Sequence, residues 1–222
     1  MRHTWIGVAT LVALSVALPT HAATPAGSWT NGGTIGADTG ALYATVGFPS
    51  LDIGYLRGVS DALDVGGRFS FPYGGDGATD QTWLGLELAG EVKLKLDLGL
   101  PFVLLVRALP GVTLFFPPGF SIFFLRVPLE AALGVPVTPN LLAHVSIKAP
   151  LAFGYRSGLG VSFPEIHLPL LFGGGVELKI DPALSVTGQL HMGPGFWIFP
   201  GGDNQTHFTL GALVGVTYRL PS

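Results

Sequence analysis

LGLELAGEVKLKLD, residues 84–97, alternates apolar and charged side chains with a period of two. One parity of the segment is apolar except for small residues, and the other parity carries every charge: Glu87, Glu91, Lys93, Lys95 and Asp97. Successive side chains on a β-strand point to opposite faces, so a strand separates these two sets completely. A helix, which turns by about 100° per residue, would scatter them around its axis. The segment therefore predicts a strand with one apolar face and one charged face.

The same alternation recurs along most of the chain, at 62–71, 141–155, 165–180, 184–192 and 208–220. Residues 101–116 and 121–136 alternate less regularly and leave a helical hairpin open as an alternative. Proline interrupts a helix because it lacks an N–H and clashes with the preceding turn. Prolines inside and between these two segments therefore favour strands over helices there as well.

Short and longer turn signals separate these runs in alternation, which is typical of outer-membrane barrels with short periplasmic turns and longer outer loops. The fold class predicted is all-β, a closed antiparallel up-and-down transmembrane β-barrel of about ten strands. An even number of strands would place both chain ends on the periplasmic side. The strands are expected near 40–48, 51–58, 62–72, 82–97, 101–116, 120–136, 140–155, 163–180, 183–199 and 206–220.

The composition supports a lipid-facing surface. The chain is 48% hydrophobic and only 11% charged, with a mean hydropathy of +0.53, whereas soluble domains carry about 25% charged residues. The net charge of −3 provides no basic field for nucleic acid. The absence of cysteine excludes disulfides, thiol catalysis and cysteine metal ligands. A soluble sandwich or lipocalin-like barrel stays open, but expected strands of about 15 residues exceed the usual length.

The N-terminus resembles a secretory signal peptide. Arg2 and His3 precede an apolar stretch from Trp5 to Leu18, and Thr20-His21-Ala22 resembles a cleavage site. An uncleaved anchor is the alternative, although the apolar stretch is shorter than the ~20 residues that span a bilayer. Three parts are therefore expected, a signal peptide (1–22), a flexible N-terminal segment (23–39) and a barrel (40–222).

Two stretches resemble the broad class of small bacterial outer-membrane β-barrel proteins. Ser60-Asp61-Ala62-Leu63-Asp64-Val65-Gly66 is similar to the turn and strand that recur in that class, and Gly215, Tyr218 and Leu220 resemble its C-terminal assembly signal. The chain departs from the pattern because it ends in Leu220-Pro221-Ser222 rather than phenylalanine. The resemblance implies location in the bacterial outer membrane. It implies as partners outer-membrane lipids, lipopolysaccharide and the barrel-assembly machinery, with the oligomeric state left open.

Charged residues of the inward parity are predicted to form one belt near mid-height. They are Arg68, Glu87, Glu91, Arg107, Arg126, Glu130 and Lys148, with His191 at a similar level. Such a balanced belt forms either an ion-pair plug that fills the lumen or the constriction of a narrow channel for small polar solutes. Eight strands leave room only for side chains and sixteen leave an aqueous channel, so ten strands favour the plug.

The sequence shows no clear catalytic apparatus. It lacks a Gly-x-Ser-x-Gly elbow. His144, His167 and His191 share the inward parity but are expected too far apart in height to hold one metal ion, so no metal or cofactor is expected. An outer-rim enzyme or ligand-binding surface remains an alternative, drawing on Asp76, Asp80, His167, Asp203 and His207. The predicted role is therefore structural or passive.

A further pattern concerns the aromatic residues, many of which flank the longer loops. They are expected to form a girdle at the membrane interface. The members are Phe71, Tyr73, Trp83, Phe115, Phe116, Phe120, Phe123, Phe153, Tyr155, Phe163, Trp197 and Phe199.

Overall fold

The computed structural model describes residues 31–74, 83–100, 102–158 and 161–220, so the expected signal peptide lies outside the described residues. The strands are β1 (Gly40–Phe48), β2 (Ser50–Gly58), β3 (Leu63–Pro72), β4 (Gly85–Leu96), β5 (Val103–Ala108), β6 (Gly111–Phe115), β7 (Phe120–Thr138), β8 (Leu141–Gly158), β9 (Val161–Pro169), β10 (Leu171–Lys179), β11 (Leu184–Ile198) and β12 (Gln205–Leu220).

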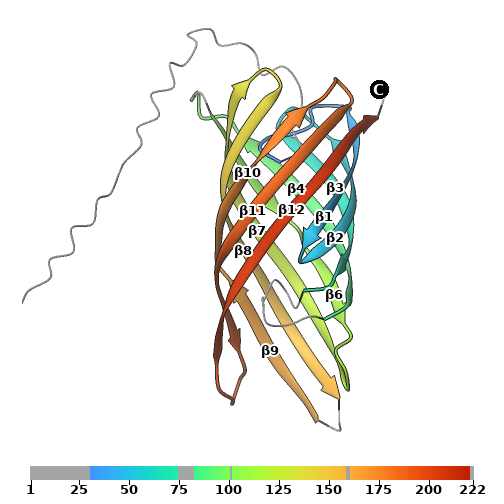
Figure 1. Cartoon of the computed structure of the whole chain (residues 1–222), viewed down its shortest axis with the longest axis vertical. Coiled ribbons are helices and arrows are strands. Elements are labelled where there is room, and N and C mark those ends of the chain that lie inside the picture. Colours follow the sequence, from blue (N-terminus) through green and yellow to red (C-terminus); the bar gives the residue numbers. More distant parts are fainter. Residues whose placement is uncertain (1–30, 75–82, 101, 159–160, 221–222) are drawn as a thin grey trace, which may run out of the picture.

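These strands close into an antiparallel barrel with ten wall positions, which confirms the predicted fold class (Figure 1). β12 pairs with β1, and each further neighbour pairs in turn until β11 returns to β12. β5 and β6 follow one another between β4 and β7, and β9 and β10 do so between β8 and β11. The expected single strands at 101–116 and 163–180 are therefore each interrupted once, next to Pro110 and Pro169.

The alternation of the sequence sets the two faces of the wall. On β4, Leu86, Leu88 and Leu94 point outward and are exposed, whereas Glu87 and Glu91 point inward and are buried. The same division holds on β12, where Val214 and Val216 are exposed and Thr217 is buried. Along these two strands the polar groups thus face the lumen and the apolar groups face the exterior.

Four short turns share one hydrogen-bond pattern. In each, a side-chain oxygen accepts a hydrogen bond from the backbone N–H two residues further on. The acceptors are Ser60, Asp97, Thr138 and Asp181, at 3.2, 2.9, 3.3 and 2.7 Å. Such side-chain turns reverse the chain without a longer loop. At Asp97 the acceptor is followed by Gly99 at φ 66°, a left-handed conformation that favours glycine.

The opposite end of the barrel is uneven. β1 and β2 have nine residues each, whereas β7 has nineteen and β8 has eighteen. In Figure 1 the β8–β9 hairpin therefore extends far below the β1–β2 hairpin, while the C-terminus lies among the short turns at the top. Within the described residues, no helix is long and apolar enough to cross a membrane.

Candidate functional site in the barrel lumen

The register of neighbouring strands places several charged residues in one row along the inner face of the wall. Asp64 on β3 stands opposite Lys93 on β4, Lys93 opposite Arg107 on β5, and Arg107 opposite Glu130 on β7. Glu130 in turn stands opposite Lys148 on β8. Directly opposed residues have Cβ atoms about 4.5–5.5 Å apart. The row therefore places unlike charges within reach of one another along most of its length.

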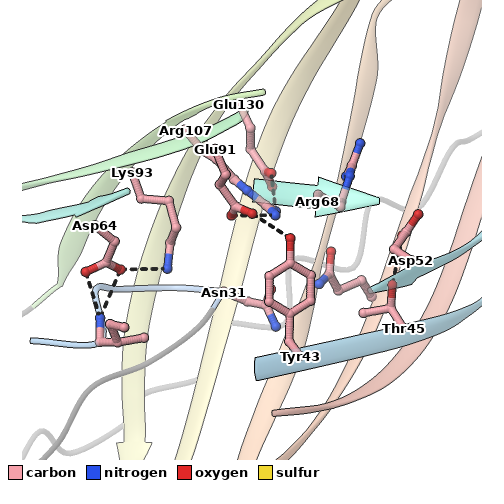
Figure 2. A network of polar contacts seen from close by, with 12 residues as sticks. Asn31, Tyr43, Thr45, Asp52, Asp64, Arg68, Glu91, Lys93, Arg107 and Glu130 are labelled. Atoms are coloured by element: carbon pink, nitrogen blue, oxygen red, sulfur yellow. Dashed lines mark hydrogen bonds and ion pairs between the residues drawn. The ribbon is translucent and has the colours of Figure 1, made fainter. Parts of the chain in front are cut away.

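Arg107 links this row to a second acid. Its guanidinium lies 2.7 Å from the Glu91 carboxylate and 3.6 Å from the Glu130 carboxylate. Glu91 also accepts a hydrogen bond of 2.5 Å from the Tyr43 hydroxyl (Figure 2). On the other side, Lys148 Nζ lies 3.5 Å from Glu130 Oε1. Each of the two acids thus meets at least two partners.

A separate group surrounds Glu87. Arg68 pairs with Glu87 Oε1, while Arg126 Nη1 lies 2.9 Å and Thr113 Oγ1 lies 3.0 Å from Oε2. Buried charges cost several kcal/mol each in desolvation unless partners compensate for it. Two guanidinium groups and one hydroxyl around a single carboxylate supply that compensation.

The eight residues singled out from the sequence all line the lumen, in these two groups. His191 is the least strongly tied, because its Nε2 lies 3.9 Å from Glu130 Oε1. Its close partner is Ser146, whose Oγ lies 2.7 Å from the same nitrogen. The sequence did not indicate that partnership.

The structure also shows inward polar residues that were not assigned to the predicted belt. Lys93 and Asp64 form an ion pair of 3.1 Å with both side chains fully buried, and Thr45 donates a 2.8 Å hydrogen bond to Asp52 (Figure 2). Parity placed Lys93 and Asp64 on the inward face, but both lie closer to the short turns than the belt. A belt at a single mid-height level therefore does not include them.

Among the described residues, these side chains border a larger and a smaller cavity. The larger has a volume of about 170 Å³ and reaches Pro49, Leu109 and Pro150, and the smaller has about 50 Å³ and reaches Asn31 and Tyr43. Arg68, Arg107 and Lys148 line both cavities, together with Asp52 and Leu213. The same charged side chains of the belt therefore border both spaces.

The end of the lumen opposite the short turns, here called the outer end, holds an aromatic cluster. Some residues that were expected in the outward girdle belong to this cluster instead. Phe115, Phe124 and Trp197 point inward and are buried, and Trp83, Phe120 and Phe199 pack against them. The Arg156 guanidinium lies 4.9–6.0 Å from the ring centroids of Trp83, Phe120, Trp197 and Phe199. These residues flank the outer loops, as expected, but inward parity turns them into the lumen. The outward members are Phe71, Phe116, Phe123, Phe153 and Tyr155, while the side chain of Phe163 lies outside the description.

The end of the lumen at the short turns, here called the inner end, holds the described part of the N-terminal segment, residues 31–39. Ile35 N donates to both Asp64 oxygens, at 3.2 and 3.0 Å, and the Thr34 hydroxyl donates to Asp61 O at 2.9 Å. Ile35 is buried among Ala41, Tyr43 and Leu56. The sequence predicted a flexible segment here and gave no sign of this docking, because the contacts join residues far apart in the chain.

The segment crosses from one wall to the other. At its start, Asn31 N donates to Glu177 Oε2 on β10 at 3.1 Å. Gly32 then lies so close to β7 that a Cβ on Gly134 would fall 2.2 Å from the Gly32 carbonyl oxygen. Since Ile35 contacts the opposite side through Asp64 on β3, residues 31–35 lie across the inner end of the lumen.

Two histidines meet at the outer rim. His167 and His207 have their Nε2 atoms 3.1 Å apart, and Trp197 Nε1 donates to His207 Nε2 at 3.2 Å. Asp76 and Asp80 lie outside the described residues, and Asp203 is exposed in the β11–β12 loop. Across the described ranges, no group of three histidine or acidic residues could hold a metal ion.

Ser146, His191 and Glu130 resemble a hydrolytic constellation only in composition. In a catalytic triad the acid holds the imidazole nitrogen opposite the one that meets the serine. Here the Glu130 carboxylate and the Ser146 hydroxyl both approach His191 Nε2. The arrangement therefore differs from a triad in where the acid meets the imidazole.

No protein-family model matches the chain, and no curated protein matches it. Solved structures match the chain at low identity, among them the following three. A de novo designed transmembrane β-barrel is 15% identical over 83% of this chain and 97% of its own, with a TM-score of 0.30. A major outer membrane protein of Thermus thermophilus is 14% identical (82% and 99% covered, TM-score 0.33). Ail, the attachment invasion locus protein of Yersinia pestis, is 11% identical (82% and 94% covered, TM-score 0.23).

TM-scores this low assign neither a family nor an activity. The chain is a closed β-barrel. The resemblance to small outer-membrane barrels is thus confirmed at the level of the fold.

Proposed function

We propose that the chain is an integral protein of the bacterial outer membrane, exported with a cleaved signal peptide. The observation that carries this proposal is the inverted polarity of the barrel. Leucine, valine and phenylalanine side chains cover the exterior of the strands, whereas Lys93, Asp64 and Glu91 are buried inside. A closed barrel satisfies its backbone hydrogen bonds internally, which makes it one of the two structures that can span hydrocarbon.

We further propose that the lumen is closed and that the role is structural or passive, without catalysis. Three layers support closure: the aromatic cluster around Trp197, the ion-pair belt around Glu87 and Glu130, and the N-terminal segment at Asn31–Ile35. A solute of more than a few atoms would have to displace all three. Outer-membrane lipids, lipopolysaccharide and the barrel-assembly machinery are the partners that this location implies.

A narrow channel is the second candidate, and one observation favours it. Arg68, Arg107 and Lys148 line both cavities, so the two spaces border the same side chains. Exposed side chains rotate within picoseconds to nanoseconds, whereas ion pairs hold Arg68, Arg107 and Lys148 in place. Ions could pass from one cavity to the other only when these ion pairs open.

Planar bilayer recordings on the refolded mature chain separate the two functions. A closed lumen predicts no stepwise conductance for the full mature chain. A variant that lacks residues 23–36 and carries Arg107→Ala serves as the comparison, because it removes the inner layer and the link between Glu91 and Glu130. Steps in this variant alone would support a closed lumen. Regular steps in the unmodified chain would overturn the closed lumen and favour the channel.

A further inference from the structure

Two prolines face each other across the barrel wall. The β8 register pairs Ala152 with His167 on β9 and Lys148 with Leu171 on β10, so Pro150 stands opposite Pro169 at the junction of β9 and β10. Both have the inward parity of their strands. Pro128 on β7 is the partner of Pro150 on its other side, so the three prolines form a row through neighbouring strands.

The direction of the backbone hydrogen bonds leaves the Pro150–Pro169 pair without any. We call a pair of opposed residues a rung, and this pair an empty rung. Leu109 N donates to Pro128 O, so Pro128 directs its backbone groups toward β5 and Pro150 directs its own toward Pro169. Leu170 N donates to Pro194 O, which likewise leaves the backbone groups of Pro169 directed toward β8. Opposed residues of this kind exchange two N–H···O bonds in an ordinary ladder. Neither proline has an N–H, so this rung has two carbonyl acceptors and no donor.

The surroundings of the empty rung are apolar outside the wall, whereas inside the wall apolar side chains lie beside Lys148 and His167, the inward neighbours of Pro150 and Pro169. Outside, Leu168 and Leu170 are 37% and 39% exposed. Inside, Leu109 and Leu171 are buried at 5% and 8%, and both line the 170 Å³ cavity together with Pro128 and Pro150. The cavity therefore begins directly behind the part of the wall that lacks hydrogen bonds.

We propose that this rung is a lateral portal through which an acyl chain of the surrounding lipid enters the cavity. The proposal rests on the proposed location in a bilayer, since only then is hydrocarbon present outside Leu168 and Leu170. A dry cavity of about 150 Å³ lined by apolar side chains binds benzene. The cavity of about 170 Å³ is large enough for the end of one acyl chain, but charged side chains of the belt also line it. The acyl chain would therefore occupy only the part beside Leu109, Leu171, Pro128 and Pro150. The charged belt limits its depth, because hydrocarbon cannot replace the partners of Arg126 and Glu130.

The portal opens without breaking a rung. Separation of an ordinary antiparallel pair breaks two hydrogen bonds, and each costs more in hydrocarbon than in water because no solvent replaces it. At Pro150–Pro169 those bonds do not exist, so the strands can part locally while the neighbouring rungs hold. Restoration of the bonds with alanine should close the portal.

The experiment uses the refolded mature protein in phosphatidylcholine vesicles that contain a phospholipid with a diazirine midway along one acyl chain. Photolabelled residues are identified by mass spectrometry in the wild type and in the double variant Pro150→Ala with Pro169→Ala. Pro194→Ala is the matched control, because it adds one N–H opposite Leu170 and leaves the Pro150–Pro169 rung empty. Leu170 and Leu171 provide an internal comparison, since they are adjacent in sequence and face opposite sides of the wall.

We expect labelling of Leu170 in all three proteins and of Leu171 in the wild type and in Pro194→Ala. The double alanine variant should lose labelling at Leu171 by about tenfold, which corresponds to about 1.4 kcal/mol, with Leu170 unchanged. Leu56, which is also inward and buried but lies on a fully paired wall, should stay unlabelled.

The outcomes distinguish the two proposals. Labelling of Leu170 without Leu171 would overturn the portal and leave the bilayer location intact, as would equal labelling of Leu171 in the wild type and the double variant. A lack of labelling at Leu170 and at the exposed Leu88 would instead overturn the bilayer location itself.

Discussion

Lys93 and Asp64 form an ion pair of 3.1 Å in which neither side chain is exposed to solvent, although the outward side chains of β4 are leucine and valine. Asp64 also accepts two hydrogen bonds from the backbone N–H of Ile35. This one pair thus connects two wall strands with the N-terminal segment that lies across the inner end.

Removal of one partner of the Lys93–Asp64 pair should lower the free energy of unfolding much more than removal of both. Lys93→Met leaves the Asp64 carboxylate buried without its cation, and loss of one member of a buried pair typically costs about 3–5 kcal/mol. The double variant Lys93→Met with Asp64→Leu should recover most of that loss, because it leaves no unpaired charge. Urea unfolding of the refolded proteins in vesicles measures the free energy. Equal stability of the single variant and the wild type would contradict the buried pair.

Leu88 tests the outward face at mid-strand, because it is 64% exposed on β4. An arginine on the lipid face at the bilayer midplane costs about 2–4 kcal/mol, so Leu88→Arg should impair assembly. Leu98→Arg is the control, since Leu98 is also exposed but lies in the short turn after β4. Heat-modifiable mobility in gels reports the folded fraction. Equal folding of both variants would count against the assigned lipid face.

Gly134 tests the docking of the N-terminal segment. Gly134→Val would place a Cβ 2.2 Å from the Gly32 carbonyl oxygen, so the segment should be displaced while the wall keeps its register. Proteinase K should then remove residues before Gly40 much faster than in the wild type. Gly188→Val is the matched control, because a Cβ there meets no heavy atom within 4 Å. Unchanged cleavage in Gly134→Val would show that the segment does not rest against β7.

Trp197 tests the layer at the outer end. The side chain is 2% exposed and its indole packs against Phe124 at 6.0 Å and Trp83 at 5.7 Å between ring centroids. Trp197→Ala should lower the free energy of unfolding by about 3–5 kcal/mol, as is usual for a buried aromatic residue. Phe116→Ala changes an outward aromatic residue that is 52% exposed, and its effect should be much smaller. Comparable losses in the two variants would contradict an aromatic core inside the barrel.

Strand faces were predictable because a period of two is a local property. The assignment of Leu88 outward and of Glu87 and Glu91 inward required only parity, and the structure agrees with it. The number of wall positions also followed from the turns. The interruptions at Pro110 and Pro169 were not foreseen, because whether a proline breaks a strand depends on the rung that it faces.

Contacts between side chains of different strands could not be predicted from the sequence. The tilt and stagger of the strands decide which inward residues meet, and a single sequence does not reveal them. Arg107 was placed in the lumen, but its simultaneous contacts with Glu91 and Glu130 depend on the register of three strands. The inward Phe115 and Trp197 were assigned to the girdle because position along the strand was weighed above parity.

Fractionation of bacterial envelopes tests the inverted polarity most directly. After expression of the full chain, we expect the mature protein to sediment with the outer membrane, to resist high-salt and carbonate washes, and to dissolve only in detergent. Recovery of the folded protein in the soluble periplasmic fraction, without detergent, would contradict a barrel with leucine outside and Lys93 and Asp64 inside.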